Sequence, residues 1–258
     1  DKFHILKYLS KEVEFKDVTD EVACLGVFGP KSRSLMSKLS KDDFSNENFK
    51  FSTSKEIKIN NKKIWAQRLS YVGELGFELY IKMNESREIY NLIVDKGKEF
   101  NISHCGMFAM DTMRMEKGYL HWGHDMSPEE NQYEAGLKFA ISFKKNTDFV
   151  GKKAIEKIKN EKIKKMMVMF TLKNNKPGFP LLLHDEPIYC DGKIVGRTTS
   201  GNYSFNYEKN MSFGYLNLVF PKEELAKKTF FIEVEKKQHE AILQIKPLHD
   251  PDNKIIKS

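Results

Sequence analysis

The chain has 258 residues, of which 40% are hydrophobic and 31% charged, and its formal net charge is +7. These proportions are those of a folded globular protein with one sizeable core and a smaller second one, and they exclude a disordered chain. Only five of the 43 basic residues are arginines, and the lysines are scattered. The charge therefore does not predict a nucleic-acid-binding surface, although it favours the encounter with an anionic ligand.

Signals for membranes, secretion and metal binding are weak. No apolar run approaches the roughly 20 residues that a membrane-spanning helix needs, and the first ten residues lack the pattern of a signal peptide. Cys24, Cys105 and Cys190 lie far apart, without the spacing of a zinc site or a disulfide framework. We therefore expect buried structural thiols, no metal, no membrane association and a reducing, cytoplasmic compartment.

The first part of the chain mixes helical and strand periodicity. Because it opens directly with a helical pattern, we expect the chain to begin in the middle of a fold. In chain order, the sequence predicts a helix at 3–9, a strand at 18–28, a helix after Pro30, strands at 57–59 and 64–70 joined by an Asn60-Asn61 turn, a strand at 77–81, a helix capped by Asn84 and a helix at 107–116 closed by Gly118.

The second part changes in character after a charged stretch at 152–165, which predicts a short solvated helix and a linker. Beyond it, short apolar runs separated by Gly and Asn predict a small all-β unit, a barrel or a curled sheet. We expect an α+β protein with domains at 1–160 and 166–258. The predicted strands of the second domain lie at 166–172, 188–198, 212–219, 230–235 and 240–245.

The stretch from Ser70 to Tyr80 contains two glycines, Gly73 and Gly76, three residues apart with a glutamate between them. This spacing predicts a tight turn between two strands, which fixes the directions of two acidic side chains and an aromatic one. Taken alone, the stretch is equally consistent with an ordinary β-turn that carries surface glutamates.

A second stretch, residues 106–126, places Arg114 among apolar residues near the end of a helix. A guanidinium that is partly buried needs an anionic partner, and the candidates are Glu116, Glu78 or an anionic ligand. A structural ion pair is the alternative. His121 and His124 would point to opposite faces of a strand, which is unsuitable for chelating a metal.

In this order and at this separation, the two stretches resemble the aminomethyltransferase family, the T-protein of the glycine cleavage system and its relatives. The similarity continues at residues 131–137, 148–152, 199–203 and 247–251, so it covers nearly the whole chain. The forms at 116–123 and 134–137 are closer to the folate-binding halves of dimethylglycine and sarcosine dehydrogenases than to a free T-protein.

The resemblance implies intertwined α/β subdomains followed by a small C-terminal β-barrel, with tetrahydrofolate as the cofactor. It implies that Tyr71 lines the pterin pocket and that Glu78 accepts hydrogen bonds from adjacent pterin N–H groups, a charge-assisted fork. It also implies that Arg114 holds the folate, directly or by orienting a carboxylate, and that Trp122 packs on the ring system.

One segment of the family pattern has no counterpart. The family's catalytic aspartate follows a Gly-Gly pair, and this sequence contains no such pair. We therefore assign no catalytic residue, and expect either that a missing N-terminal part of the folate-binding domain supplies this segment or that the chain does not turn over alone. The resemblance implies a flavin dehydrogenase domain or a lipoyl carrier protein as a partner. The sequence itself lacks the Gly-x-Gly-x-x-Gly pattern of a flavin site.

The predicted function is tetrahydrofolate-dependent transfer of a one-carbon unit from a methylated amine or an aminomethyl donor. The alternative is a non-catalytic, folate-binding regulatory or structural protein of the same fold. Relatives of that kind carry a Lys-Gly-Cys-Tyr-x-Gly-Gln-Glu motif, which is not found in this sequence. A nucleic-acid binder is suggested by the charge alone.

Overall fold

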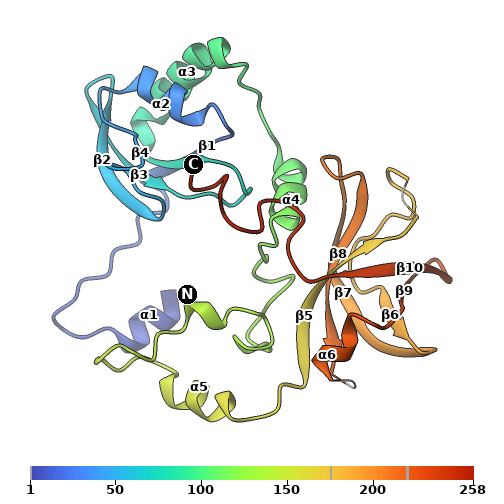
Figure 1. Ribbon diagram of the computed structural model, residues 1–258. Coiled ribbons are helices and arrows are strands. Elements are labelled where there is room, and N and C mark those ends of the chain that lie inside the picture. The colour runs from blue at the N-terminus through green and yellow to red at the C-terminus, as the bar shows by residue number, and fades with distance from the viewer. Residues whose placement is uncertain (1, 175, 219–220) are drawn as a thin grey trace. The chain divides into compact units, whose positions relative to one another are not determined.

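The computed structural model describes residues 2–174, 176–218 and 221–258 (Figure 1). They form two compact units. Unit 1 comprises residues 1–70, 74–104 and 254–258, and unit 2 comprises residues 71–73 and 105–253. The predicted domain boundary at 160–166 falls inside unit 2, just before the barrel, and the predicted division into two domains stays a prediction.

Unit 1 is built on a four-stranded antiparallel sheet in the order β1-β4-β3-β2. Its strands are β1 (Val22–Phe28), β2 (Thr53–Ile59), β3 (Lys62–Arg68) and β4 (Gly76–Lys82). Its helices are α1 (Lys2–Tyr8), α2 (Ser32–Leu39) and α3 (Met83–Gly97), followed by the 3-10 turn η1 (Lys98–Phe100).

One face of this sheet forms the core of unit 1, and α2 and α3 pack on it (Figure 1). Successive side chains of a strand point to opposite faces, so every second residue of β3 and β4 enters this core. The strands contribute Ile64, Ala66, Phe77, Leu79 and Ile81, and the helices contribute Leu35, Met36, Ile89 and Ile93. The other face of the sheet carries polar and aromatic side chains of β1, β3 and β4.

Local signals explain most of the connections in unit 1. Asn60 and Asn61 both adopt positive φ, 48° and 62°, which confirms the predicted hairpin turn between β2 and β3. The predicted cap at Asn84 is wrong. Helix α3 begins at Met83 with Lys82 in the capping position and no side-chain cap, because strand β4 runs directly into the helix.

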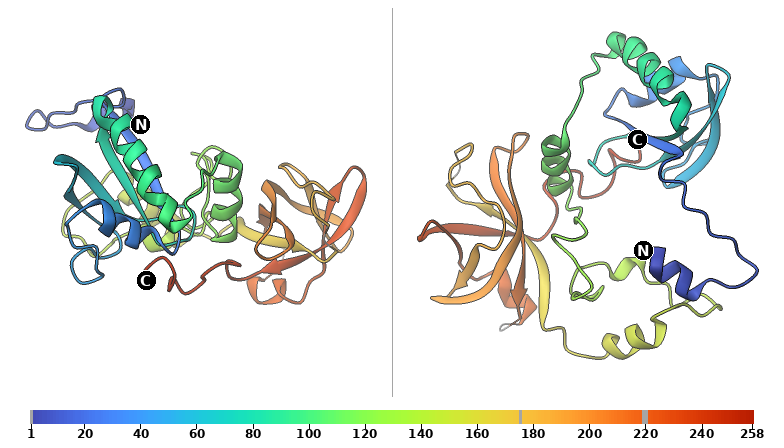
Figure 2. Two further views of the ribbon diagram at one scale, coloured as in Figure 1. Left: turned by 90° about the horizontal axis from the view of Figure 1, so that it is seen from above. Right: turned by 180° about the vertical axis from the view of Figure 1, so that it is seen from behind.

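Unit 2 begins with α4 (Met107–Glu116), as predicted, and then contains the 3-10 turn η2 (Lys138–Ala140) and α5 (Lys152–Lys159). Its last part is a closed six-stranded barrel in the order β10-β5-β8-β7-β6-β9 (Figure 2), which confirms the predicted barrel. The strands are β5 (Lys165–Leu172), β6 (Pro187–Cys190), β7 (Lys193–Ser204), β8 (Lys209–Asn217), β9 (Phe230–Val234) and β10 (Lys237–Gln244), with α6 (Lys222–Leu225) between β8 and β9.

The barrel differs from the prediction in one place. The run at 188–198 is not one strand but a hairpin of β6 and β7, because Asp191 and Gly192 adopt positive φ of 50° and 72° and form a tight turn. The end of the strand predicted at 212–219 includes Val219, which lies outside the described residues.

The prediction of three buried thiols is wrong for two of them. Cys190 is buried in the barrel core, whereas Cys24 and Cys105 are exposed. Cys24 is exposed because it alternates along β1 with Leu25, which packs against the core, and therefore points to the opposite face. Among the described residues, no helix combines the length and the apolar character needed to cross a membrane.

Candidate functional site

The face of the unit 1 sheet opposite α2 and α3 carries polar and aromatic side chains in ordered rows. We call the outward residues of β1, β3 and β4 the open face. Side chains of directly paired residues lie on the same face of a sheet, so the pairing defines two rows across these strands. The first row is Trp65, Tyr80 and Cys24, and the second is Gln67, Glu78 and Gly26.

Glu78 is the only acidic side chain of these two rows, and it is partly exposed. The hydroxyl of Tyr80, two residues along the same strand, donates a 2.8 Å hydrogen bond to Oε2 of Glu78. This bond, together with burial, raises the pKa of Tyr80 above its ordinary value, so Tyr80 stays a donor. Because a carboxylate offers about four acceptor positions, Glu78 retains capacity for further donors.

An aromatic ring borders Glu78 on the β1 side. A Cβ atom added to Gly26 would lie 2.4 Å from the ring of Phe28, and one added to Gly76 would lie 2.1 Å from the same ring. The ring therefore lies directly over both glycines, and no other residue type at these two positions leaves it that space. Gly26 is paired with Glu78, so the ring covers the position beside the carboxylate.

In unit 2, Arg114 is the centre of a buried polar network and is only 2% exposed. Its Nε donates to Asp111 at 2.7 Å, and its Nη2 donates to the hydroxyl of Ser200 at 2.9 Å. Its Nη1 donates to the carbonyl of Tyr119 at 3.1 Å and forms an ion pair with Asp125. All three nitrogens of the guanidinium are thus directed at protein acceptors.

Asp125 is fully buried, and several donors besides Arg114 satisfy it. Its Oδ1 accepts from the hydroxyls of Thr199 at 2.6 Å and Ser200 at 2.7 Å, and its Oδ2 accepts from the backbone N–H of His121 at 2.8 Å. A buried carboxylate needs this many partners because water is not available to it.

The predicted protein partners of Arg114 are wrong. Glu116 instead accepts hydrogen bonds from Ser204 and Asn206, both at 2.7 Å. The reason is helical geometry: a residue three positions before the arginine, Asp111, lies on its side of α4, whereas one two positions after it points elsewhere. Glu78, the other candidate, belongs to unit 1 and accepts the hydrogen bond of Tyr80.

Tyr71 and Arg114 hold two successive carbonyl groups of the same segment. The hydroxyl of Tyr71 donates to the carbonyl of Leu120 at 3.1 Å, next to the carbonyl of Tyr119 that Arg114 binds. The ring of Tyr71 also stacks on that of Tyr119, with centroids 6.2 Å apart and an interplanar angle of 11°. Burial raises the pKa of Tyr71.

The turn after this segment presents Trp122, which is 61% exposed. Gly123, at a φ of 90°, allows the chain to reverse there, and its N–H bonds the carbonyl of Met126 at 2.8 Å. His121 and His124 therefore do not lie on a strand, as the prediction assumed, and their rings lie side by side with centroids 4.7 Å apart.

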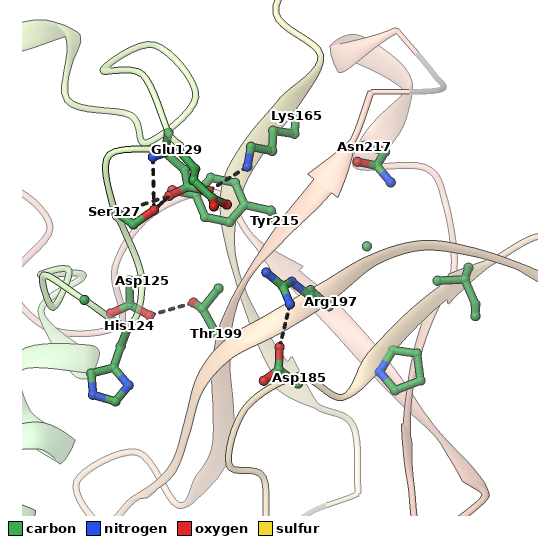
Figure 3. Close-up of a pocket in the computed structure, with 15 residues that line it drawn as sticks. His124, Asp125, Ser127, Glu129, Lys165, Asp185, Arg197, Thr199, Tyr215 and Asn217 are labelled. Atoms are coloured by element: carbon green, nitrogen blue, oxygen red, sulfur yellow. Dashed lines mark hydrogen bonds and ion pairs between the residues drawn. The ribbon is translucent and has the colours of Figure 1, made fainter.

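A cavity of about 580 Å³ lies in unit 2, between the outer face of the barrel and the chain segment 123–130 (Figure 3). Two ion pairs of the protein lie in its lining: Lys165 with Glu130 at 2.6 Å, and Arg197 with Asp185 at 2.9 Å. The described residues that line it include Asp125 and Thr199 but not Tyr71, Arg114 or Trp122. This cavity is therefore not the pocket that the sequence predicted.

Of the four residues predicted to bind folate, three belong to unit 2 and one belongs to unit 1. Tyr71, Arg114 and Trp122 belong to unit 2, with the first two holding one segment, and Glu78 belongs to unit 1. Sequence reasoning missed Asp125, although its place nine residues after the end of α4 and two residues after Gly123 was a signal. It also missed two neighbours of Glu78 that come from other strands, Phe28 and Gln67, because only strand pairing brings them to it.

The crystal structure of the glycine cleavage system aminomethyltransferase T from Bartonella henselae superposes with a TM-score of 0.76, over 89% of this chain and 60% of that one, at 18% sequence identity. An α+β unit together with a closed barrel is thus the fold of a T-protein-type aminomethyltransferase.

The sequence comparisons define the family. Residues 1–145 match the GCVT N-terminal domain, and residues 165–250 match the glycine cleavage T-protein C-terminal barrel domain. The chain belongs to the glycine cleavage T-protein family, which confirms the resemblance drawn from its motifs.

Two relatives show where the chain lies in this family. It is 37% identical over 222 residues to the human mitochondrial dimethylglycine dehydrogenase, an alignment covering 83% of this chain and 25% of the relative. It is 34% identical over 206 residues to an aminomethyltransferase from Thermoanaerobacter sp. (strain X514), covering 80% of this chain and 54% of the relative. The chain therefore spans about a quarter of the length of the dehydrogenase and about half that of the aminomethyltransferase.

Proposed function

We propose that the chain binds tetrahydrofolate and serves in the transfer of a one-carbon unit to it. Family membership supports this proposal, since the proteins similar to this chain include an aminomethyltransferase and a dehydrogenase of a methylated amine. The observation that carries it is Glu78, a partly exposed carboxylate with unused acceptor capacity between aromatic side chains on the open face.

The open face fits the chemistry of a reduced pterin. Such a ring presents adjacent N–H donors at one edge, and a carboxylate accepts two of them in a charge-assisted fork. Phe28 and Tyr80 border Glu78, and Trp65, paired with Tyr80, is 48% exposed and offers a flat apolar surface. When bound, the folate supplies the nitrogen that accepts the carbon unit; Glu78 holds and orients the ring.

The same proposal assigns Tyr71, Arg114 and Trp122 of unit 2 to folate binding, by resemblance to the family. Trp122 is exposed and suited to stacking. Arg114 directs its nitrogens at protein acceptors, so we assign it the indirect role of orienting Asp111, whose side chain is partly exposed. The carbon donor is a methylated amine or an aminomethyl group, delivered by a dehydrogenase domain or a lipoyl carrier protein.

Two further parts of the proposal concern the cellular compartment and the catalytic residue. The exposed cysteine side chains of Cys24 and Cys105 support a reducing, cytoplasmic compartment. We assign no catalytic residue, and a chain that binds folate without turning it over would correspond to the non-catalytic alternative.

Calorimetric titration with 5-formyltetrahydrofolate tests the proposal. We expect wild type to bind and Glu78→Ala to lose affinity by about tenfold or more, because the charge-assisted fork contributes well over 1.4 kcal/mol. Glu56→Ala is the matched control, since Glu56 is paired with Trp65 on the same face, one strand further from Glu78, and is held only by an exposed ion pair with Lys63. Wild type that does not bind refutes folate binding, and equal loss in both variants refutes the role of Glu78.

A further inference from the structure

Gln67 lies directly opposite Glu78 in the sheet. The two residues are paired across β3 and β4, and their neighbours Trp65 and Tyr80 are paired in the same register. Directly opposite side chains on one face have their Cβ atoms about 5 Å apart. A carboxylate and a carboxamide therefore stand side by side on the open face, both partly exposed.

The surroundings of Glu78 allow a ligand edge to extend in only one direction across the strands. On the β1 side its paired residue is Gly26, and the ring of Phe28 lies over that glycine. On the β3 side its paired residue is Gln67, which carries two N–H donors. A polar edge that binds Glu78 therefore continues toward Gln67, because the other side offers an apolar ring.

From β4 to β3, the pair presents two hydrogen-bond acceptors, the carboxylate oxygens of Glu78, and then a hydrogen-bond donor, the amide N–H of Gln67. The group with the complementary sequence of donor, donor and acceptor is a 2-amino-4-oxopyrimidine, through its 2-amino group, its N3–H and its O4. We infer that Gln67 is a specificity-determining residue that donates to O4 of a pterin whose N3–H and 2-amino group bind Glu78. This inference rests on the proposed function and adds to it which edge of the pterin ring the protein recognises.

Tyr80 acts as a positioning residue in this arrangement. Its hydroxyl holds Oε2 of Glu78 at 2.8 Å and thereby fixes the plane of the carboxylate on the strand. When the carboxylate of Glu78 is fixed, a ring that binds it through two N–H groups must place its third group, O4, above Gln67. A carboxylate that rotates would bind ring edges in several orientations.

The inference predicts discrimination at the edge of the ring that carries N3 and position 4. In aminopterin the 4-oxo group of folic acid is a 4-amino group and N3 carries no hydrogen, so the acceptor that faces Gln67 becomes a donor and Glu78 loses the N3–H donor. Variants at Gln67 separate the contribution of position 4 from that of N3. Wild type should prefer folic acid. Gln67→Glu replaces the donor by an acceptor and should lower the ratio of folic acid to aminopterin affinity by on the order of tenfold, and Gln67→Leu should bring it closer to one.

Gln238→Glu is the matched control, because Gln238 is also a strand glutamine paired directly with a glutamate, Glu233, in the barrel. Calorimetry on the full chain measures both ligands, with thermal unfolding to confirm that each variant folds. A ratio that shifts in Gln67→Glu but not in Gln238→Glu supports the inference. A ratio unchanged in Gln67→Glu overturns it while folate binding by wild type still upholds the proposed function.

Guanine has the same edge, so GTP is included as a third ligand. We expect no binding of GTP at concentrations that saturate the folic acid site, because the proposal commits to a pterin. Binding of GTP that competes with folic acid and depends on Gln67 overturns the pterin assignment and transfers the edge recognition to a nucleotide. Failure of wild type to bind either pterin refutes the proposed function itself.

Discussion

Two carboxylates, Asp125 in unit 2 and Glu78 in unit 1, stand in opposite environments. Asp125 is fully buried and accepts from Arg114, His121 and two hydroxyls. Glu78 is partly exposed, and Tyr80 is the partner that the described contacts give it. A fully satisfied carboxylate stabilises the fold, whereas one with unused acceptor capacity at the surface is available to a ligand.

Acidic residues near similar motifs thus differ in whether their tertiary surroundings satisfy them fully, as for Asp125, or leave acceptor positions open, as for Glu78. Both carboxylates lie close to the glycine-containing stretches from which the sequence predicts function. Their different surroundings predict different losses: removing a partner of Asp125 should cost stability, and removing the partner of Glu78 should cost affinity.

The largest expected effect is on stability, from Arg114→Met. This change leaves Asp125 buried without its ion-pair partner, which costs about 3–5 kcal/mol. Chemical denaturation of the full chain measures the free energy of unfolding. Arg197→Met is the control, because Arg197 is 70% exposed in its ion pair with Asp185, and such pairs contribute at most about 1 kcal/mol. Similar losses in the two variants would remove the distinction between buried and exposed pairs.

A smaller effect, on affinity, is expected from Tyr80→Phe. Loss of the 2.8 Å hydrogen bond lets the carboxylate of Glu78 rotate, so the affinity for 5-formyltetrahydrofolate should fall roughly fivefold, which corresponds to about 1 kcal/mol. In the barrel, burial and the nearby Glu233 raise the pKa of the Tyr189 hydroxyl, so this tyrosine also stands beside a strand glutamate. Tyr189→Phe should therefore leave the affinity unchanged, and an equal loss in both variants would show that the effect is not local to Glu78.

The smallest effect concerns a third carboxylate, Asp42, which accepts from the backbone N–H of Lys58 and from Ser40, both at 2.8 Å. The bond from Lys58 holds the pKa of Asp42 below its ordinary value of 3.8 in the folded state. The ionised carboxylate of Asp42 therefore stabilises the folded state fully above its unfolded-state pKa. This stabilisation is lost as the pH falls through the lower folded-state pKa.

Asp42→Asn should therefore make the stability of the protein depend less on pH in the acid range. Denaturation between about pH 5 and pH 2 measures this slope, and Asp20→Asn, at an exposed turn, is the control. A slope that is the same in wild type and Asp42→Asn would show that Asp42 contributes nothing to the acid sensitivity.

Much of the architecture followed from local patterns. Alternation predicted β2, β3 and β4, and the helix from Met107 to Glu116 was predicted with its end at Gly118, whose φ is 80°. The barrel followed from the short apolar runs after residue 165. The errors lie where two elements join without a loop, as at Asn84, or where a turn interrupts an apolar run, as at Asp191.

The sequence by itself determined the periodicity of the elements and the motifs that identify the family, because both are properties of nearby residues. Only the tertiary structure decided that Asp125 satisfies Arg114 and that Gln67 and Phe28 stand beside Glu78. These neighbours come from different strands and loops, and the register that brings them together is set by long-range pairing, which no local pattern encodes.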